Sequence, residues 1–130
     1  MIISKAEQFF RIINSEEEAR EATNGRYVLA FMASWAQPCR AMVEEIERVY
    51  PRIKRKLDDL RVGLGYIDID NQELKVFLRE ARIDSIPVFF AYNSGRQVGE
   101  LYGLRLGGEL ERFIDLYSHS ERTQEAHARV

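Results

Sequence analysis

The sequence predicts a single α/β domain in which strands and helices alternate along the chain. The apolar run Tyr27–Ala33 leads at once into a long amphipathic pattern, as a buried strand followed by a helix would. The alternating run Val62–Asp70 is followed by a second helical pattern. Two further strand patterns, Val88–Tyr92 and Gln97–Tyr102, flank a glycine-containing turn, which predicts a hairpin, and a last helix follows.

Length and composition fit one globular domain with an ordinary core. The chain has 130 residues, of which 45% are hydrophobic, and a formal net charge of -2. This charge gives no general attraction to nucleic acid or to an anionic membrane, and no apolar stretch is long enough to span a bilayer. We expect the domain to occupy residues 1–117. Residues 118–130 form a polar tail that is either a helix extension or disordered.

The N-terminal part predicts a strand and a short helix. Residues 1–9 read as a short helical or irregular lead, and residues 9–13 (FFRII) as a strand. Ser15 with Glu18 three positions later has the pattern of a capping box at a helix start. Asn24-Gly25 then ends this helix.

The central stretch is YVLAFMASWAQPCR. Trp35–Pro38 forms a strand-to-helix loop, because Pro38 suits the first turn of a helix and Cys39 then begins an apolar face. The positive end of a helix dipole at this point favours a thiolate. Pro51 interrupts the helical pattern and predicts a kink near Tyr50.

The second half supplies the remaining elements. After the strand at residues 62–70, Asp70-Asn71 starts a helix whose apolar face runs through Phe77 to Ala81. The turn at residues 93–96 joins the hairpin strands, and Gly107-Gly108 leads into the last helix.

Trp35, Pro38 and Cys39 resemble the signature of the thioredoxin family, Trp-Cys-Gly-Pro-Cys between a strand and a helix. The resemblance covers about residues 9–117. It implies a thioredoxin fold, a central mixed sheet in the order β-α-β-α-β-α-β-β-α flanked by helices. The departure is Ala36, which stands where the family has its attacking cysteine, with Gln37 at the glycine.

The missing cysteine excludes the family's dithiol reaction within this chain. Cys39 is the only cysteine, so no intramolecular disulfide can form, and dithiol exchange needs one thiolate to attack and a second to resolve. The resemblance places Cys39 at the resolving position. It also places Ala30 where the family has a buried aspartate and Tyr66 where it has a lysine, so an acid–base partner is missing too.

The resemblance further implies a partner-binding groove beside the Cys39 loop. The family has a cis peptide bond at the position of Ile86-Pro87 and a glycine nearby at the position of Gly103. Backbone before the proline pairs there with an extended segment of the partner. The expected partner-binding residues are Trp35, Ala36, Gln37, Pro38, Ile86 and Pro87.

Three functions follow as alternatives. The first is a redox-inactive interaction module or assembly subunit that uses this groove. The second is a monothiol oxidoreductase or thiol sensor, acting through Cys39 in cell redox homeostasis. The third, an ordinary dithiol reductase, conflicts with the single cysteine. A further interpretation of Cys39 is a small buried residue kept for packing.

The expected partner is another protein or a peptide segment, with no nucleic acid and no membrane. We expect no cofactor, and no metal site, because His119 and His127 lie in the tail without a ligand cluster. The first ten residues lack a long apolar core and a small-residue cleavage site, so we expect no secretory signal. One cysteine fits the cytoplasm or another reducing compartment.

Overall fold

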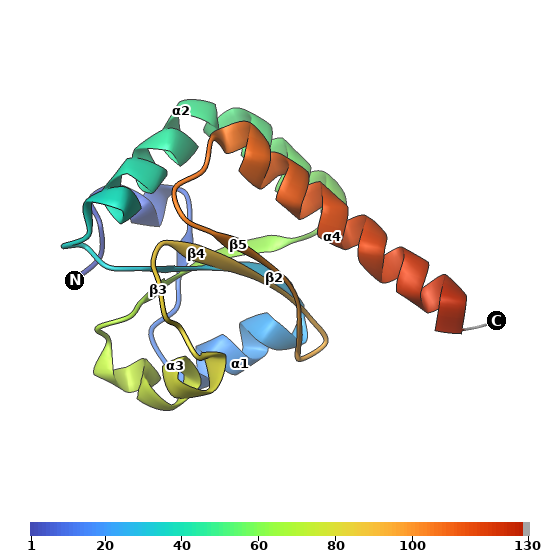
Figure 1. The fold of residues 1–130 in the computed structure, drawn as a ribbon, viewed down its shortest axis with the longest axis horizontal. Helices are drawn as coiled ribbons and strands as arrows, with labels where there is room; N and C mark the ends of the chain where they lie inside the picture. The colour runs from blue at the N-terminus through green and yellow to red at the C-terminus, as the bar shows by residue number, and fades with distance from the viewer. Residues whose placement is uncertain (129–130) are drawn as a thin grey trace.

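The fold is a five-stranded mixed sheet with helices on both faces (Figure 1). The computed structural model describes the backbone of residues 1–128 and the side chains of residues 1–117. In chain order the elements are η1 (Ala6–Gln8), β1 (Arg11–Ile12), α1 (Glu16–Asn24), β2 (Arg26–Met32), α2 (Gln37–Leu60), β3 (Gly63–Asp68), η2 (Gln72–Leu74), α3 (Lys75–Ala81), β4 (Val88–Asn93), β5 (Arg96–Tyr102) and α4 (Gly107–Ala128).

The sheet has the strand order β1-β3-β2-β4-β5. β1 and β2 both run parallel to β3, whereas β4 is antiparallel to β2 and β5 is antiparallel to β4. The predicted α/β class, mixed sheet and order of elements are therefore confirmed. Central strand β2 is buried along most of its length, as its continuous apolar run predicts.

Two helical layers bury the two faces of the sheet. α2 and α4 lie on one face, and α1 and α3 lie on the other (Figure 1). The first face holds the larger core cluster, centred on residues such as Met42, Ile46 and Leu110. The second holds a smaller cluster that includes Leu29, Phe31 and Phe90.

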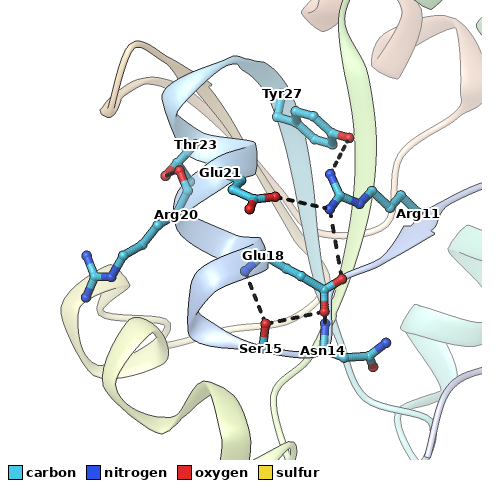
Figure 2. Close-up of polar contacts among 8 residues, drawn as sticks. All are labelled: Arg11, Asn14, Ser15, Glu18, Arg20, Glu21, Thr23 and Tyr27. Atoms are coloured by element: carbon cyan, nitrogen blue, oxygen red, sulfur yellow. Dashed lines mark hydrogen bonds and ion pairs between the residues drawn. The ribbon is translucent and has the colours of Figure 1, made fainter.

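The predicted capping box at the start of α1 is present (Figure 2). The Glu18 amide donates to the Ser15 hydroxyl oxygen at 3.1 Å, and the Glu18 carboxylate accepts from the Asn14 amide at 3.2 Å. The guanidinium of Arg11 lies 3.9 Å from the carboxylates of Glu18 and Glu21. These contacts fix the direction in which the chain enters α1.

Of the strand expected at residues 9–13, only Arg11 and Ile12 form one. The amides of Phe9 and Phe10 both donate to the Ala6 carbonyl, so this backbone closes the η1 turn instead of pairing with β3. Phe10 then packs edge-on against Tyr66, with ring centroids 5.7 Å apart. Phe10 therefore packs into the core from a turn, and β1 is only two residues long.

The kink predicted from Pro51 lies at Val49, whose backbone angles are not helical. Gly107, at the start of α4, packs directly against the Val49 side chain, and a Cβ on Gly107 would overlap it. The kink and the glycine together allow the two helices to approach closely.

Two other boundaries differ from the expectation or extend it. The helix expected from Asp70-Asn71 starts as the 3₁₀ turn η2, with the Asn71 side chain accepting from the Glu73 amide, and becomes α-helical only at Lys75. α4 continues to Ala128 and extends beyond the sheet (Figure 1). Of the two alternatives expected for residues 118–130, the backbone through Ala128 is a helix extension, and residues 129–130 lie outside the described part. No helix among the described residues is long and apolar enough to cross a membrane.

Glu45 of α2 caps the N-terminus of α4. Its carboxylate accepts from the Gly107 amide at 2.6 Å and from two nitrogens of Arg48 at 2.9 and 2.7 Å. The Arg48 hydrogen bonds, followed by the Gly107 amide, lower the pKa of Glu45 to about 2. This carboxylate therefore couples the two helices that cover one face of the sheet.

We expect Glu45→Gln to lower the free energy of unfolding at pH 7 by about 1 kcal/mol, the usual effect of losing a helix cap. Because folding lowers the pKa of Glu45, its contribution is complete above the unfolded value near 4.5 and is lost as the pH falls toward 2. Urea unfolding followed by circular dichroism at pH 7 and pH 3 measures both effects.

The control is Glu44→Gln, which changes an exposed neighbour on α2 by the same chemistry. Equal unfolding curves for the two variants at both pH values would show that the cap does not stabilise the fold.

Candidate functional site

The predicted site residues lie on two loops at one end of the sheet. The β2–α2 loop, in cyan at the left of Figure 1, leaves the sheet where β4 begins, because Phe31 pairs with Val88 in the antiparallel β2–β4 ladder. Trp35 therefore follows β2 at the same end at which Ile86 and Pro87 precede β4. The topology brings together Trp35 and Ile86, which are 51 positions apart in the sequence.

The β2–α2 loop is tight and presents alternating exposed and buried residues. The Ala36 amide donates to the Ala33 carbonyl at 3.2 Å, and Ala36 caps α2 without a side-chain hydrogen bond. Trp35 is 64% exposed, whereas Ala36 is only 8% exposed. Gln37 and Pro38 are exposed and begin α2, and Pro38 lies in its first turn as the sequence predicts.

The Trp35 ring is held in place by an acidic residue after β3. Its indole N–H donates to Asp70 Oδ2 at 2.8 Å, and the Asp70 amide donates to Asp68 Oδ1 at 2.9 Å. The sequence analysis did not identify Asp70 as a site residue. Nothing in the sequence marks which of several acidic residues lies beside a loop more than 30 positions away.

Cys39 lies in the first turn of α2, as predicted, but its side chain is 0% exposed. Burial raises the pKa of the Cys39 thiol, against the weaker opposing effects of a backbone hydrogen bond at Ala33 and the charge of Arg40. The expectation of a stabilised thiolate at this helix end is therefore wrong here, because desolvation outweighs the backbone hydrogen bond and the nearby cation. Cys39 in this state is a neutral, covered thiol.

Ala30 and Tyr66 are neighbours in the β2–β3 ladder on the sheet face that Cys39 packs against. Both are 0% exposed. The Tyr66 hydroxyl accepts from the Ile3 amide at 3.2 Å, and burial raises the pKa of Tyr66 to about 12. A phenol with that pKa stays protonated at neutral pH, so neither residue can accept a proton from Cys39.

The Ile86–Pro87 peptide bond is cis, and Pro87 is buried while Ile86 is half-buried. The Gly103 amide donates to the Pro87 carbonyl at 2.8 Å, and Gly103 has a φ of 82°, which favours glycine. Gly103 therefore lies beside the Pro87 loop.

The end of β5 and the loop after it add exposed apolar side chains that were not among the predicted site residues. Tyr102, Leu104 and Leu106 are 41%, 51% and 64% exposed. The Arg105 amide lies 3.4 Å from the Met42 sulfur, which places this loop beside the first turns of α2. The run LYGLRL contains these residues, but alternation alone does not distinguish a buried strand end from an exposed loop.

The described residues contain no group that could hold a metal. Among residues 1–117, no three His, Cys, Asp or Glu side chains cluster in a way that could bind an ion. His119 and His127 lie outside the residues whose side chains the structure describes. What the site offers is a rigid aromatic surface next to a covered sulfur.

Comparisons with known proteins agree with this architecture. The family model described as Thioredoxin matches residues 2–116. Thioredoxin H2-1 of Oryza sativa subsp. japonica is 30% identical over 107 residues, which cover 82% of this chain and 71% of the rice protein. Mitochondrial thioredoxin O of the same organism is 28% identical over 103 residues, which cover 79% of this chain but only 53% of the relative, so the chain spans about half its length.

The fold also agrees with a solved structure. The thioredoxin Mala s 13 of Malassezia sympodialis superposes with a TM-score of 0.68 at 23% identity, over 84% of this chain and 90% of that protein. The family model covers both site loops, and the fold agrees with that of the solved thioredoxin. This chain belongs to the thioredoxin family.

Proposed function

We propose that this domain is a docking module that holds an extended segment of another protein without exchanging a disulfide with it. The observation that carries the proposal is the contrast between a fully buried Cys39 and a 64% exposed Trp35 on the same loop. Disulfide exchange requires an accessible thiolate and a second thiol, and this chain offers neither. What the β2–α2 loop does present is the exposed surface of Trp35, which another protein can contact.

The docking face consists of Trp35, Gln37, Pro38 and Ile86. Trp35 supplies the large aromatic surface that dominates the free energy of many interfaces. Ala36 and Pro87, which the sequence analysis grouped with these residues, are almost buried and act by shaping the face from beneath.

The backbone at Ile86 supports an extended partner. Within the described residues, neither its amide nor its carbonyl has a backbone hydrogen-bond partner. An extended segment can pair with such groups as an added strand does, and its side chains then contact Trp35 and Pro38. Main-chain pairing would provide affinity, and the aromatic contact would provide selectivity.

The face is also preorganised. The hydrogen bond between Trp35 and Asp70 and the one between Gly103 and Pro87 hold its two loops in place before a partner arrives. Binding to a rigid surface costs less ordering entropy than binding to mobile loops.

The altered motif supports a non-covalent role. Ala36 and Gln37 stand where the family resemblance places the attacking cysteine and its glycine, and Ala30 with Tyr66 replaces its acid–base pair. A domain of this kind works equally well in the cytoplasm or another reducing compartment, because its contacts include no sulfur bond.

The second candidate is thiol chemistry at Cys39, as a monothiol oxidoreductase or sensor. The observation that favours it is the position of Cys39 in the first turn of α2, directly after the exposed Pro38. This function requires the loop to open, because the buried sulfur cannot otherwise reach a disulfide or peroxide.

We expect Ile86→Asp and Trp35→Ala each to weaken partner binding at least about tenfold, because a buried charge or a lost aromatic anchor costs roughly 1.4 kcal/mol or more. The assay selects extended peptides on the native protein by display and measures their dissociation constants by calorimetry.

The control is Val76→Asp, which places the same charge at a 43% exposed position on α3. Peptides that bind all three variants as tightly as the native protein would show that the docking face is not the binding surface. A dependence of binding on reductant would favour the thiol function instead.

We expect Cys39 in the native protein to react with a disulfide reagent at least about 100-fold more slowly than in urea, since reaction requires local opening. The matched control is Gln37→Cys combined with Cys39→Ala, which moves the thiol two residues to an exposed position. Native labelling of Cys39 as fast as in this control would reverse the order of the two candidate functions.

We expect no measurable insulin reduction by the native protein with a dithiol donor, and weak turnover by Ala36→Cys, in which two cysteines become available in the motif. Turnover of insulin by the native protein would contradict the docking proposal. Inactivity of Ala36→Cys would show that Ala30 and Tyr66 also block the reaction.

A further inference from the structure

A second candidate site lies on the opposite face of the sheet from Cys39. A pocket of about 280 Å³ opens between α1, α3 and the β4–β5 hairpin. The hairpin is tied to the end of α1, because the Gly95 amide donates to the Thr23 carbonyl at 2.8 Å. The α1 and hairpin walls of this pocket are therefore tied to each other, and α3 forms the third wall.

Tyr92 of β4 lines the pocket and is 8% exposed. Among the described residues no hydrogen bond to its hydroxyl is found, and none of their buried polar atoms lacks a partner, so this oxygen is open to the pocket. Burial raises the pKa of Tyr92, so the group is a protonated donor at neutral pH. A hydroxyl that is open to the pocket can donate to a molecule bound there.

Gln97 of β5 provides the complementary group. A bulge in the hairpin pairs Ala91 with Gly99 but Tyr92 with Gln97, so these two side chains are direct cross-strand neighbours on the same face. The Gln97 amide nitrogen donates to Glu100 at 3.0 Å, which leaves its carbonyl oxygen as an acceptor. A donor and an acceptor thus lie side by side.

The other walls are aromatic and methyl surfaces with a charged rim. Phe77 of α3 is 7% exposed and lies against Tyr92, with ring centroids 6.4 Å apart. Arg20 and Glu80 stand at the rim as a loose, exposed ion pair 3.8 Å apart, which leaves no net charge there. Figure 2 shows Arg20 and Thr23 on the side of α1 that faces away from the Arg11 network.

The geometry points to a second binding site, for a small neutral planar molecule that carries a hydrogen-bond acceptor and a donor, such as a heteroaromatic amide. The acceptor meets the Tyr92 hydroxyl, the donor meets the Gln97 carbonyl, and the ring lies against Phe77. The pocket is smaller than the roughly 300 to 1,000 Å³ of drug-sized sites, so the ligand is of single-ring size. The balanced rim selects against a net charge.

The probe is nicotinamide, a neutral ring with an amide, titrated into the full chain labelled with ¹⁵N. We expect saturable binding with a dissociation constant on the order of 1 mM, as for a ligand of this size. Shift changes are expected at Thr23, Phe77 and Gln97. Tyr92→Phe keeps the ring but removes the donor, and should weaken binding about fivefold.

Gln97→Ala changes an exposed residue, leaves the core intact and should weaken binding by a similar factor. Tyr50→Phe makes the same chemical change as Tyr92→Phe on the other face and should bind as the native protein does. Absence of saturable binding, equal affinity of Tyr92→Phe and the native protein, or shift changes confined to Trp35 and Ile86 would each overturn the proposal.

Discussion

The packing of the first turn of α2 against β2 and β3 determines what the rest of the molecule can do. Cys39, Ala30 and Tyr66 are each fully buried within one apolar cluster. Interiors are close-packed, so the sulfur cannot be uncovered without moving the helix that carries it. The helix turn that follows the exposed Trp35 therefore also keeps the Cys39 thiol out of solvent.

The elements of the fold could be predicted where one local pattern decides the structure. The apolar run of β2, the cap at Ser15 and the kink just before Pro51 each follow from a few neighbouring residues. The strand expected at residues 9–13 is present only at Arg11–Ile12, because Phe9 and Phe10, although apolar, belong to the turn before it. The amides of Phe9 and Phe10 instead donate to the Ala6 carbonyl, and this turn places Phe10 against Tyr66.

The site was less predictable, because its properties depend on contacts between distant segments. The sequence placed Cys39 correctly at a helix start, but the direction of its pKa shift depends on packing against β2 and β3. A helix terminus contributes at most about 2 kcal/mol to a charged group, whereas burial of an unpaired charge costs several. The partner of Trp35, Asp70, and the exposed Leu104 and Leu106 likewise became visible only in three dimensions.

A docking face without an accessible sulfur has a consequence for how a partner would be held. Covalent capture by a thiol depends on the redox poise of the compartment, because the mixed disulfide forms and breaks with it. The contacts available here are an aromatic ring, a proline and free backbone groups, none of which changes with redox state. Hydrogen bonds from Trp35 to Asp70 and from Gly103 to Pro87 fix that surface from within the domain. Under the docking proposal, affinity at this face would depend on shape and main-chain pairing, and a partner would stay bound when the redox state of its surroundings changes.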